Sequence, residues 1–118
     1  MANTFKTVTA AGITTEEQIY VAGGSVIATI VLGIMIANTT TSQVTVSVKL
    51  ASDTASRTHS GTNSGANATV FLVKNAPVPV GSSLELLAGN KVVLEDTDEL
   101  LLTASGSSDI TISIMEIS

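Results

Sequence analysis

The segment QVTVSVKL, from Gln43 to Leu50, decides the fold class of this chain. Apolar and polar residues alternate strictly along it, with valine or leucine at positions 44, 46, 48 and 50 and polar residues between them. Side chains of a strand point alternately to its two faces. The pattern therefore predicts an antiparallel strand with one face in a core and the other in water.

Similar segments recur along the chain about every ten to twelve residues, with turn-forming residues between them. No window shows the periodicity of a helix. We therefore predict an all-β fold, a single antiparallel β-sandwich of eight to nine strands, with jelly-roll and immunoglobulin-like topologies both open. The predicted strands are Thr4–Thr9, Gln18–Ala22, Val26–Ala37, Gln43–Leu50, Thr69–Lys74, Leu84–Leu87, Val92–Glu95, Leu100–Ala104 and Ile110–Ile117.

The core of this sandwich is predicted to be aliphatic. The chain of 118 residues has no Trp, one Tyr and two Phe, whereas Val, Ile and Leu are abundant. β-Branched side chains favour strands, and a chain of this length can bury a core without disulfides. The chain has no cysteine, which excludes disulfides, thiolate metal sites and cysteine nucleophiles.

Two segments are predicted to contribute little to the core of a domain that spans residues 13–118. Residues 1–12 are polar around Phe5, and we predict an arm or weak strand that docks on a neighbouring protein through Phe5. Residues 51–66 are small and polar, and they predict a long exposed loop. Arg57 and His59 are the candidate binding side chains of this loop.

Two strands have irregular patterns. Pro77 and Pro79 cannot donate ladder hydrogen bonds, so the segment APVPVG is predicted to lie at a sheet edge and to end in a turn at Gly81. In the last strand, isoleucines alternate up to Ile114, but Glu116 occupies the next position in phase. A bulge near Ile114 or Met115 would explain this change.

Charge and hydropathy exclude two kinds of partner. The net charge is −5 and the five basic residues do not cluster, so we expect no direct contact with nucleic acid. The apolar run 21–37 is short for a membrane helix, contains Gly23 and Gly24, and lacks flanking basic residues, so we expect no membrane partner. The polar amino terminus shows no secretory signal.

No residue pattern indicates catalysis. His59 is the single histidine and lies in the polar loop, without the nucleophile motif of a hydrolase. The acidic residues between Glu95 and Glu99 lack the spacing of a calcium loop and are predicted to form a solvated turn. We therefore predict no catalytic, cofactor-binding or metal-binding residue, no cofactor and no enzymatic activity.

The strand Val26–Ala37 is apolar on both of its faces. Its larger face is predicted to point inward. The smaller face is predicted to form an oligomer interface, with a homotrimer preferred and a dimer or ring also open. In the alternative, Thr4–Thr9 or the proline edge covers this face within one subunit. The predicted interface residues are Ile27, Val31 and Met35.

Three stretches carry a resemblance to a known group of proteins: VLGIMIANTTTSQVTVSV, KNAPVPVGSSLELLAGNKVVLE and LLLTASGSSDITISIMEIS. Together they resemble small virion structural proteins of tailed bacteriophages, especially those of marine and cyanobacterial hosts. The resemblance runs from about Thr4 to the carboxy terminus. The chain departs from the pattern at Thr97, where relatives often carry glycine.

This resemblance implies a non-enzymatic virion protein, most simply a capsid decoration or cement protein. A tail, neck or fibre-base component is the alternative, and a soluble binding or adhesion module that uses the 51–66 loop is a further one. The implied partners are the protein itself and other virion proteins, such as the major capsid protein or tail components. The implied location is the virion, after synthesis in the host cytoplasm.

Overall fold

The computed structural model describes residues 3–52, 68–87 and 89–118, and these residues form nine β-strands and no helix. All strand pairs are antiparallel, so the predicted all-β sandwich is confirmed. No helix capable of crossing a membrane occurs in the described ranges. The strands are β1 (Asn3–Ile13), β2 (Glu17–Val21), β3 (Ala28–Asn38), β4 (Val44–Ala51), β5 (Thr69–Val78), β6 (Ser83–Leu86), β7 (Val92–Glu95), β8 (Glu99–Ala104) and β9 (Ser108–Ile117).

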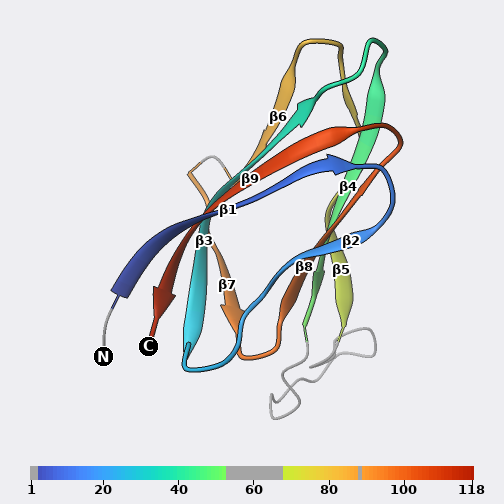
Figure 1. The fold of residues 1–118 in the computed structure, drawn as a ribbon. Helices are drawn as coiled ribbons and strands as arrows, with labels where there is room; N and C mark the ends of the chain where they lie inside the picture. Colours follow the sequence, from blue (N-terminus) through green and yellow to red (C-terminus); the bar gives the residue numbers. More distant parts are fainter. Residues whose placement is uncertain (1–2, 53–67, 88) are drawn as a thin grey trace.

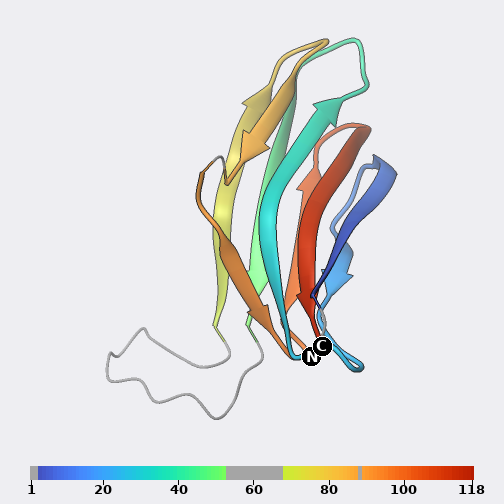
Figure 2. The same cartoon turned by 90° about the vertical axis from the view of Figure 1, so that its left-hand side faces the viewer.

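The strands form two sheets that lie face to face (Figures 1 and 2). Sheet A has the order β1-β9-β3, and both β6 and β7 pair with the far side of β3. β6 pairs with residues 34–37 and β7 with residues 28–31, so the two short strands together act as one interrupted edge strand. Sheet B has the order β2-β8-β4-β5.

The pairing is nested along the chain: β1 pairs with β9, β2 with β8, β3 with β6 and β7, and β4 with β5. A long hairpin that is rolled in this way into two packed sheets is a jelly roll. The strand order therefore decides between the two topologies that the sequence left open.

The space between the sheets is filled by aliphatic side chains, as predicted. Alternate residues of β4, namely Val44, Val46 and Val48, are buried. They belong to the core between the two sheets, so the QVTVSVKL segment has the predicted orientation. The other buried core residues are Ile13, Ala22, Val31, Ile34, Ile36, Val78, Leu94, Leu100, Leu102, Ala104, Ile110, Ile112 and Ile114.

β3 carries an irregularity that the sequence did not reveal. Its register with β9 shifts between Val31 and Gly33, which leaves Leu32 as an extra residue. A bulge of this kind reverses the phase of a strand. Odd positions such as Val31 face the core before Leu32, and even positions such as Ile34 face it afterwards. The prediction that Val31 is exposed at an interface is therefore wrong.

β9 keeps its phase to its end, so the bulge predicted near Ile114 or Met115 is also wrong. Its register with β1 is unbroken from Asn3 to Ala10. Glu116 follows Ile114 on the inner face, where its carboxylate is bonded to Tyr20 and Lys6. The irregularity lies in the neighbouring strand β3, not in β9.

Of the two predicted alternatives for the amino-terminal segment, arm or weak strand, the structure shows a strand, β1 of sheet A. β1 has eleven residues and pairs with β9 from Asn3 to Ala10 and again at Ile13, and Val8 and Ala10 pack against the core. The sequence predicted only a weak strand over Thr4–Thr9, because threonine suits the solvated face of a sheet and gives little sign of burial. Ile13 is buried. The predicted boundary between residues 12 and 13 therefore falls inside β1.

β5 forms the edge of sheet B and contains Pro77, in agreement with the edge predicted for this segment. The chain also leaves regular strand geometry at Asn75, which has a left-handed φ of 51°. The turn at Gly81 follows, with a φ of 70°. The predicted loop 51–66 lies outside the described residues from position 53 onward, and Ala51 itself ends β4.

Candidate functional site

An apolar row crosses the outer face of sheet A. Phe5 of β1 pairs with Met115 of β9, Met115 pairs with Ile30 of β3, and Ile30 pairs with Val93 of β7. Cross-strand partners lie on the same face of a sheet, about 4.5–5.5 Å apart. Phe5 is 71% exposed and Val93 is 55% exposed, whereas Ile30 and Met115 are half-buried between them. We call these four residues the apolar row.

The other half of the same face is mainly polar. Thr9 pairs with Thr111, Thr111 with Met35, and Met35 with Glu85. Met35 is 44% exposed, in agreement with its predicted outward position. Leu32, the extra residue of the bulge, lies between this polar half and the apolar row.

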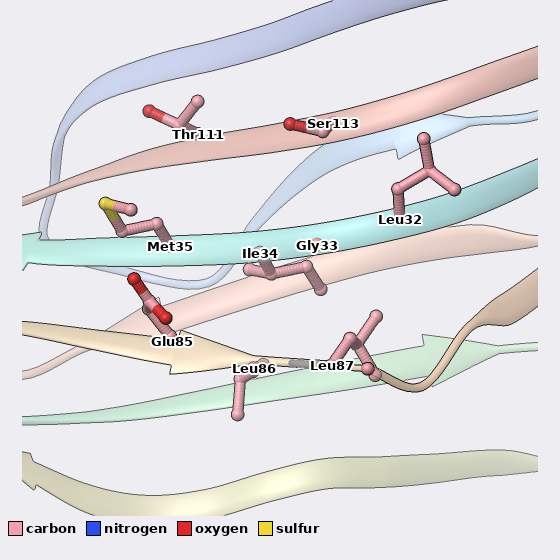
Figure 3. A pocket seen from close by; sticks show the side chains of 10 residues that line it. Leu32, Gly33, Ile34, Met35, Glu85, Leu86, Leu87, Thr111 and Ser113 are labelled. Atoms are coloured by element: carbon pink, nitrogen blue, oxygen red, sulfur yellow. The ribbon is translucent and has the colours of Figure 1, made fainter.

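A shallow depression of about 270 Å³ lies in the polar half, with β3 along its floor (Figure 3). Thr111 and Ser113 of β9 line one side of it, and Leu86 and Leu87 line the other. Glu85 is the one charged side chain among the residues that line it. This volume is below the range typical of small-molecule sites.

A polar network joins the two sheets at the end of the sandwich where β1 begins and β9 ends. The Tyr20 hydroxyl of β2 donates to Glu116 Oε2 at 2.7 Å and lies 2.8 Å from Thr29 Oγ1 of β3. Lys6 Nζ of β1 lies 2.7 Å from Glu116 Oε1. The network therefore ties β1, β2, β3 and β9 together.

Two groups of this network have altered pKa values. The hydrogen bond from Lys6, followed by the one from Tyr20, lowers the pKa of Glu116. Burial raises the pKa of Tyr20 to about 12. Both shifts favour the bonded state at neutral pH, in which Glu116 is charged and Tyr20 is neutral. We interpret the network as a structural tie between the sheets.

The outer face of sheet B is different in character. Lys49 Nζ lies 2.6 Å from Glu16 Oε2, and this hydrogen bond lowers the pKa of Glu16. Phe71 of the edge strand β5 is 46% exposed. The amino groups of Lys49 and Lys74 lie 5.4 Å and 5.1 Å from the centre of its ring, which is within the range of cation–π attraction.

The predicted interface residues do not form one patch. Ile27 lies just before β3 and is 60% exposed, and Met35 is exposed in its second half. A strand rises about 3.3 Å per residue, so they lie roughly 25 Å apart. Val31, between them, is fully buried. The expected trimer surface of Ile27, Val31 and Met35 is therefore not present as a continuous surface.

Phe5 is exposed and lies on a strand, which is one of the two predicted alternatives for its segment. Arg57 and His59 lie outside the described residues. Sequence reasoning missed Ile30, Val93 and Met115. The missing information was the register of four strands, which brings residues from distant parts of the chain into one row.

The acidic segment forms a tight turn. The Asp98 N–H donates to the Glu95 carbonyl oxygen, and Asp98 Oδ2 accepts the Glu95 N–H, both at 3.0 Å. Thr97 has a left-handed φ of 73°, which explains why glycine suits this position. Within the described ranges, no group of three or more histidine, aspartate or glutamate side chains is arranged to hold a metal ion.

No protein-family model matches this chain, and no curated protein sequence matches it. Among solved structures, a chain from a viral particle of infectious bursal disease virus is similar over 97% of this chain and 35% of its own length, with 10% identity and a TM-score of 0.51. This chain thus spans about a third of that viral chain. At such low identity, the likeness shows a shared fold.

Two further matches have lower TM-scores. A protein of Bacillus endospore appendages, which form disulfide-linked pili, has 16% identity over 98% of this chain and 86% of its own, with a TM-score of 0.43. A chain of the Gx strain of infectious bursal disease virus has 12% identity over 97% of this chain and 36% of its own, with a TM-score of 0.27.

Proposed function

We propose that this protein is a non-enzymatic structural component of a bacteriophage virion, most simply a capsid decoration or cement protein. The observation that carries the proposal is the apolar row on the outer face of sheet A, formed by Phe5, Ile30, Val93 and Met115. An exposed apolar patch on a rigid sheet is typical of a surface that binds another protein.

The fold agrees with this role without requiring it. Jelly rolls build viral capsid domains and lectin domains, and one similar structure comes from a viral particle. A fold does not by itself imply a function. The resemblance of the sequence to small phage virion proteins, together with the apolar row, favours the virion role.

The size of the row indicates what kind of contact it can make. Complete burial of a large apolar side chain contributes about 1.5–3 kcal/mol. Association of two proteins costs an estimated 4–15 kcal/mol. The apolar row as a whole therefore acts as the centre of a broader contact, with polar residues such as Thr7 and Ser113 at its rim.

The partner surface in this proposal is another protein of the same particle, with the major capsid protein as the simplest candidate. A decoration protein would repeat this contact over the capsid lattice. A tail, neck or fibre-base component would make it at one place in the virion.

Quantitative mass spectrometry of purified virions tests the proposal. We expect hundreds of copies per particle, in fixed proportion to the major capsid protein. A few dozen copies or fewer, recovered with isolated tails, would replace decoration with the tail or neck alternative. Complete absence from washed particles would contradict the virion role and favour a soluble adhesion module.

A further inference from the structure

The strands of the described residues leave four sheet edges, and three of these edges carry features that hinder pairing with a further strand. Pro77 and the irregular Asn75 interrupt the edge of β5. β2 has only five residues and a register shift. The β6 and β7 edge is broken between the two short strands, where Leu87 has a left-handed φ of 65°. Such devices keep an edge from pairing with another chain.

The edge formed by β1 carries none of these devices over most of its length. β1 has eleven residues, contains no proline, and keeps one register with β9 from Asn3 to Ala10. Among the described strands, none pairs with its outer side. Lys6 could protect the edge, but its amino group is held by Glu116 on the inner side of the sheet.

The hydrogen-bond pattern identifies the backbone groups that face this open edge. The Thr39 N–H donates to the Ser107 carbonyl oxygen, and Asn38 is paired with Ser108. The backbone groups of successive residues in a central strand alternate between its two neighbours. Along β9, odd positions therefore face β3, and even positions from 108 onward face β1.

The even positions of β9 are paired with even positions of β1, such as Lys6 with Ile114 and Val8 with Ile112. The backbone groups of Lys6 and Val8 are thus directed at β9. Those of the odd residues Phe5, Thr7 and Thr9 are directed away from it, and they offer N–H and C=O groups to another extended strand.

We propose that this edge pairs antiparallel with β1 of a second copy, about a two-fold axis that passes through Thr7. Two identical strands that pair antiparallel are related by a two-fold axis. In such a pair, residues whose backbone groups face the edge must lie opposite residues whose backbone groups also face it. Thr7 then meets Thr7 of the second copy, and Phe5 meets Thr9. Threonine pairs and pairs between aromatic and β-branched residues are favourable across strands.

Lys6 favours the register centred on Thr7 over the register centred on Lys6 itself. A shift that centres the axis on Lys6 would place two lysines directly opposite each other, which is destabilising. In the register centred on Thr7, Lys6 meets Val8 of the second copy. The paired segment then falls within the part of β1 that has an unbroken register with β9.

This pairing has a geometric consequence. An axis perpendicular to the sheet leaves the outer faces of both copies on the same side. Phe5 and Thr9 lie four residues apart, so the two apolar rows extend in opposite directions from the shared edge and are displaced along the strands by about 13 Å. The dimer thus presents a wider apolar surface than either subunit. The inference does not depend on the virion role.

Analytical ultracentrifugation of the full chain tests the dimer. Strand pairing over seven residues is a small interface, so we expect reversible dimers with a Kd on the order of 100 µM. Thr7→Pro removes an edge-facing N–H from each copy and should weaken association by at least about tenfold. Proline is tolerated where the N–H faces solvent, so this variant should still fold.

Thr7→Val is the matched control, since it changes the side chain but keeps the N–H, and it should dimerise like the wild type. A wild-type protein that stays monomeric at millimolar concentration would overturn the proposal. Equal dimerisation of Thr7→Pro and the wild type would also overturn it, as would equal loss in both variants.

Amide hydrogen exchange of the wild type gives a second readout that does not depend on any variant. Protection at Phe5, Thr7 and Thr9 should rise with protein concentration, whereas Lys6 and Val8 should be protected at all concentrations. Concentration-independent exchange at Phe5, Thr7 and Thr9 would contradict the pairing even if the protein dimerises.

Discussion

β1 and β5 are both long edge strands with a partly exposed phenylalanine, yet their surroundings differ. On β5, Phe71 lies beneath two lysine amino groups, and Pro77 and Asn75 interrupt the edge. On β1, Phe5 is 71% exposed and the edge is regular. The edge of sheet B at β5 is therefore interrupted, whereas the edge of sheet A at β1 is regular. This difference supports our proposal that sheet A carries the binding surface.

The largest expected effect on stability comes from a proline at position 8 of β1, one residue away from the proline of the Thr7→Pro variant. Val8→Pro removes an N–H that is directed at β9 and also displaces a side chain packed on the core. We expect a loss of about 3 kcal/mol or more in the free energy of unfolding, measured by urea denaturation. Thr7→Pro should lose less than about 1 kcal/mol. Equal losses would show that the assignment of edge-facing groups is wrong.

A smaller effect is expected where β5 is held in its irregular shape. Ser47 Oγ accepts the Asn75 N–H at 2.9 Å, and Ser47 is buried. Ser47→Ala leaves this N–H without its acceptor and should cost about 1–2 kcal/mol in thermal or urea unfolding. Ser113→Ala, on the exposed outer face of sheet A, is the control and should change stability by less than about 0.5 kcal/mol. A neutral Ser47→Ala would mean that the irregular geometry of β5 at Asn75 does not depend on this bond.

Acidic pH should destabilise the pairing of β1 more than that of β5, because the start of β1 is held by the ion pair between Lys6 and Glu116. The pKa of Glu116 is lowered from 4.5, so its contribution to stability is present above pH 4.5 and is lost as the pH falls through the lowered value. Glu116→Gln should reduce stability at pH 7, and its difference from the wild type should shrink below pH 4.5. A difference that is constant with pH would contradict the role of the ion pair.

The same network predicts that the protein also loses stability at alkaline pH. The pKa of Tyr20 is raised from 10.0 to about 12, so its contribution is complete below pH 10 and is lost as the pH rises towards 12. Tyr20→Phe should remove this loss, as followed by circular dichroism at increasing pH. An unchanged alkaline transition in Tyr20→Phe would assign the loss to other groups.

The smallest effect on stability is expected from removing the proline that interrupts the β5 edge. Pro77→Thr restores an N–H at a position of β5 that faces solvent, because the Ser105 N–H bond to the Thr45 carbonyl turns Thr45 towards β8. The free energy of unfolding should fall by about 0.5 kcal/mol. In the Thr7→Pro background, this change should restore some self-association in ultracentrifugation. A strictly monomeric double variant would show that the lysines or Asn75 close this edge without help from Pro77.

The sequence alone was sufficient for the fold class, the aliphatic core and the β5 edge, because alternation and proline act locally. It was insufficient for β3, where the extra residue Leu32 reverses the phase and buries Val31. A bulge in a continuous apolar run leaves no polar residue to mark it. β1 was underestimated because its stability comes from pairing with β9, at the far end of the chain.

The candidate site depended even more on long-range register. Phe5 and Met35 could be identified as exposed from sequence, but Ile30, Val93 and Met115 could not. The apolar row exists because β7 pairs with the first half of β3 and β1 pairs with the end of β9. Such pairings depend on the global topology rather than on any local pattern.

The central claim is that the apolar row on sheet A, and not the face of sheet B, attaches this protein to its particle. The most direct measurement compares binding of the wild type, Phe5→Ser and Phe71→Ser to purified particles that lack the protein. Both variants replace a partly exposed phenylalanine on an edge strand, so both should fold. Phe5→Ser should reduce the bound copy number at least about tenfold, and Phe71→Ser should bind like the wild type. Unchanged binding of Phe5→Ser, or a greater loss in Phe71→Ser, would contradict the claim.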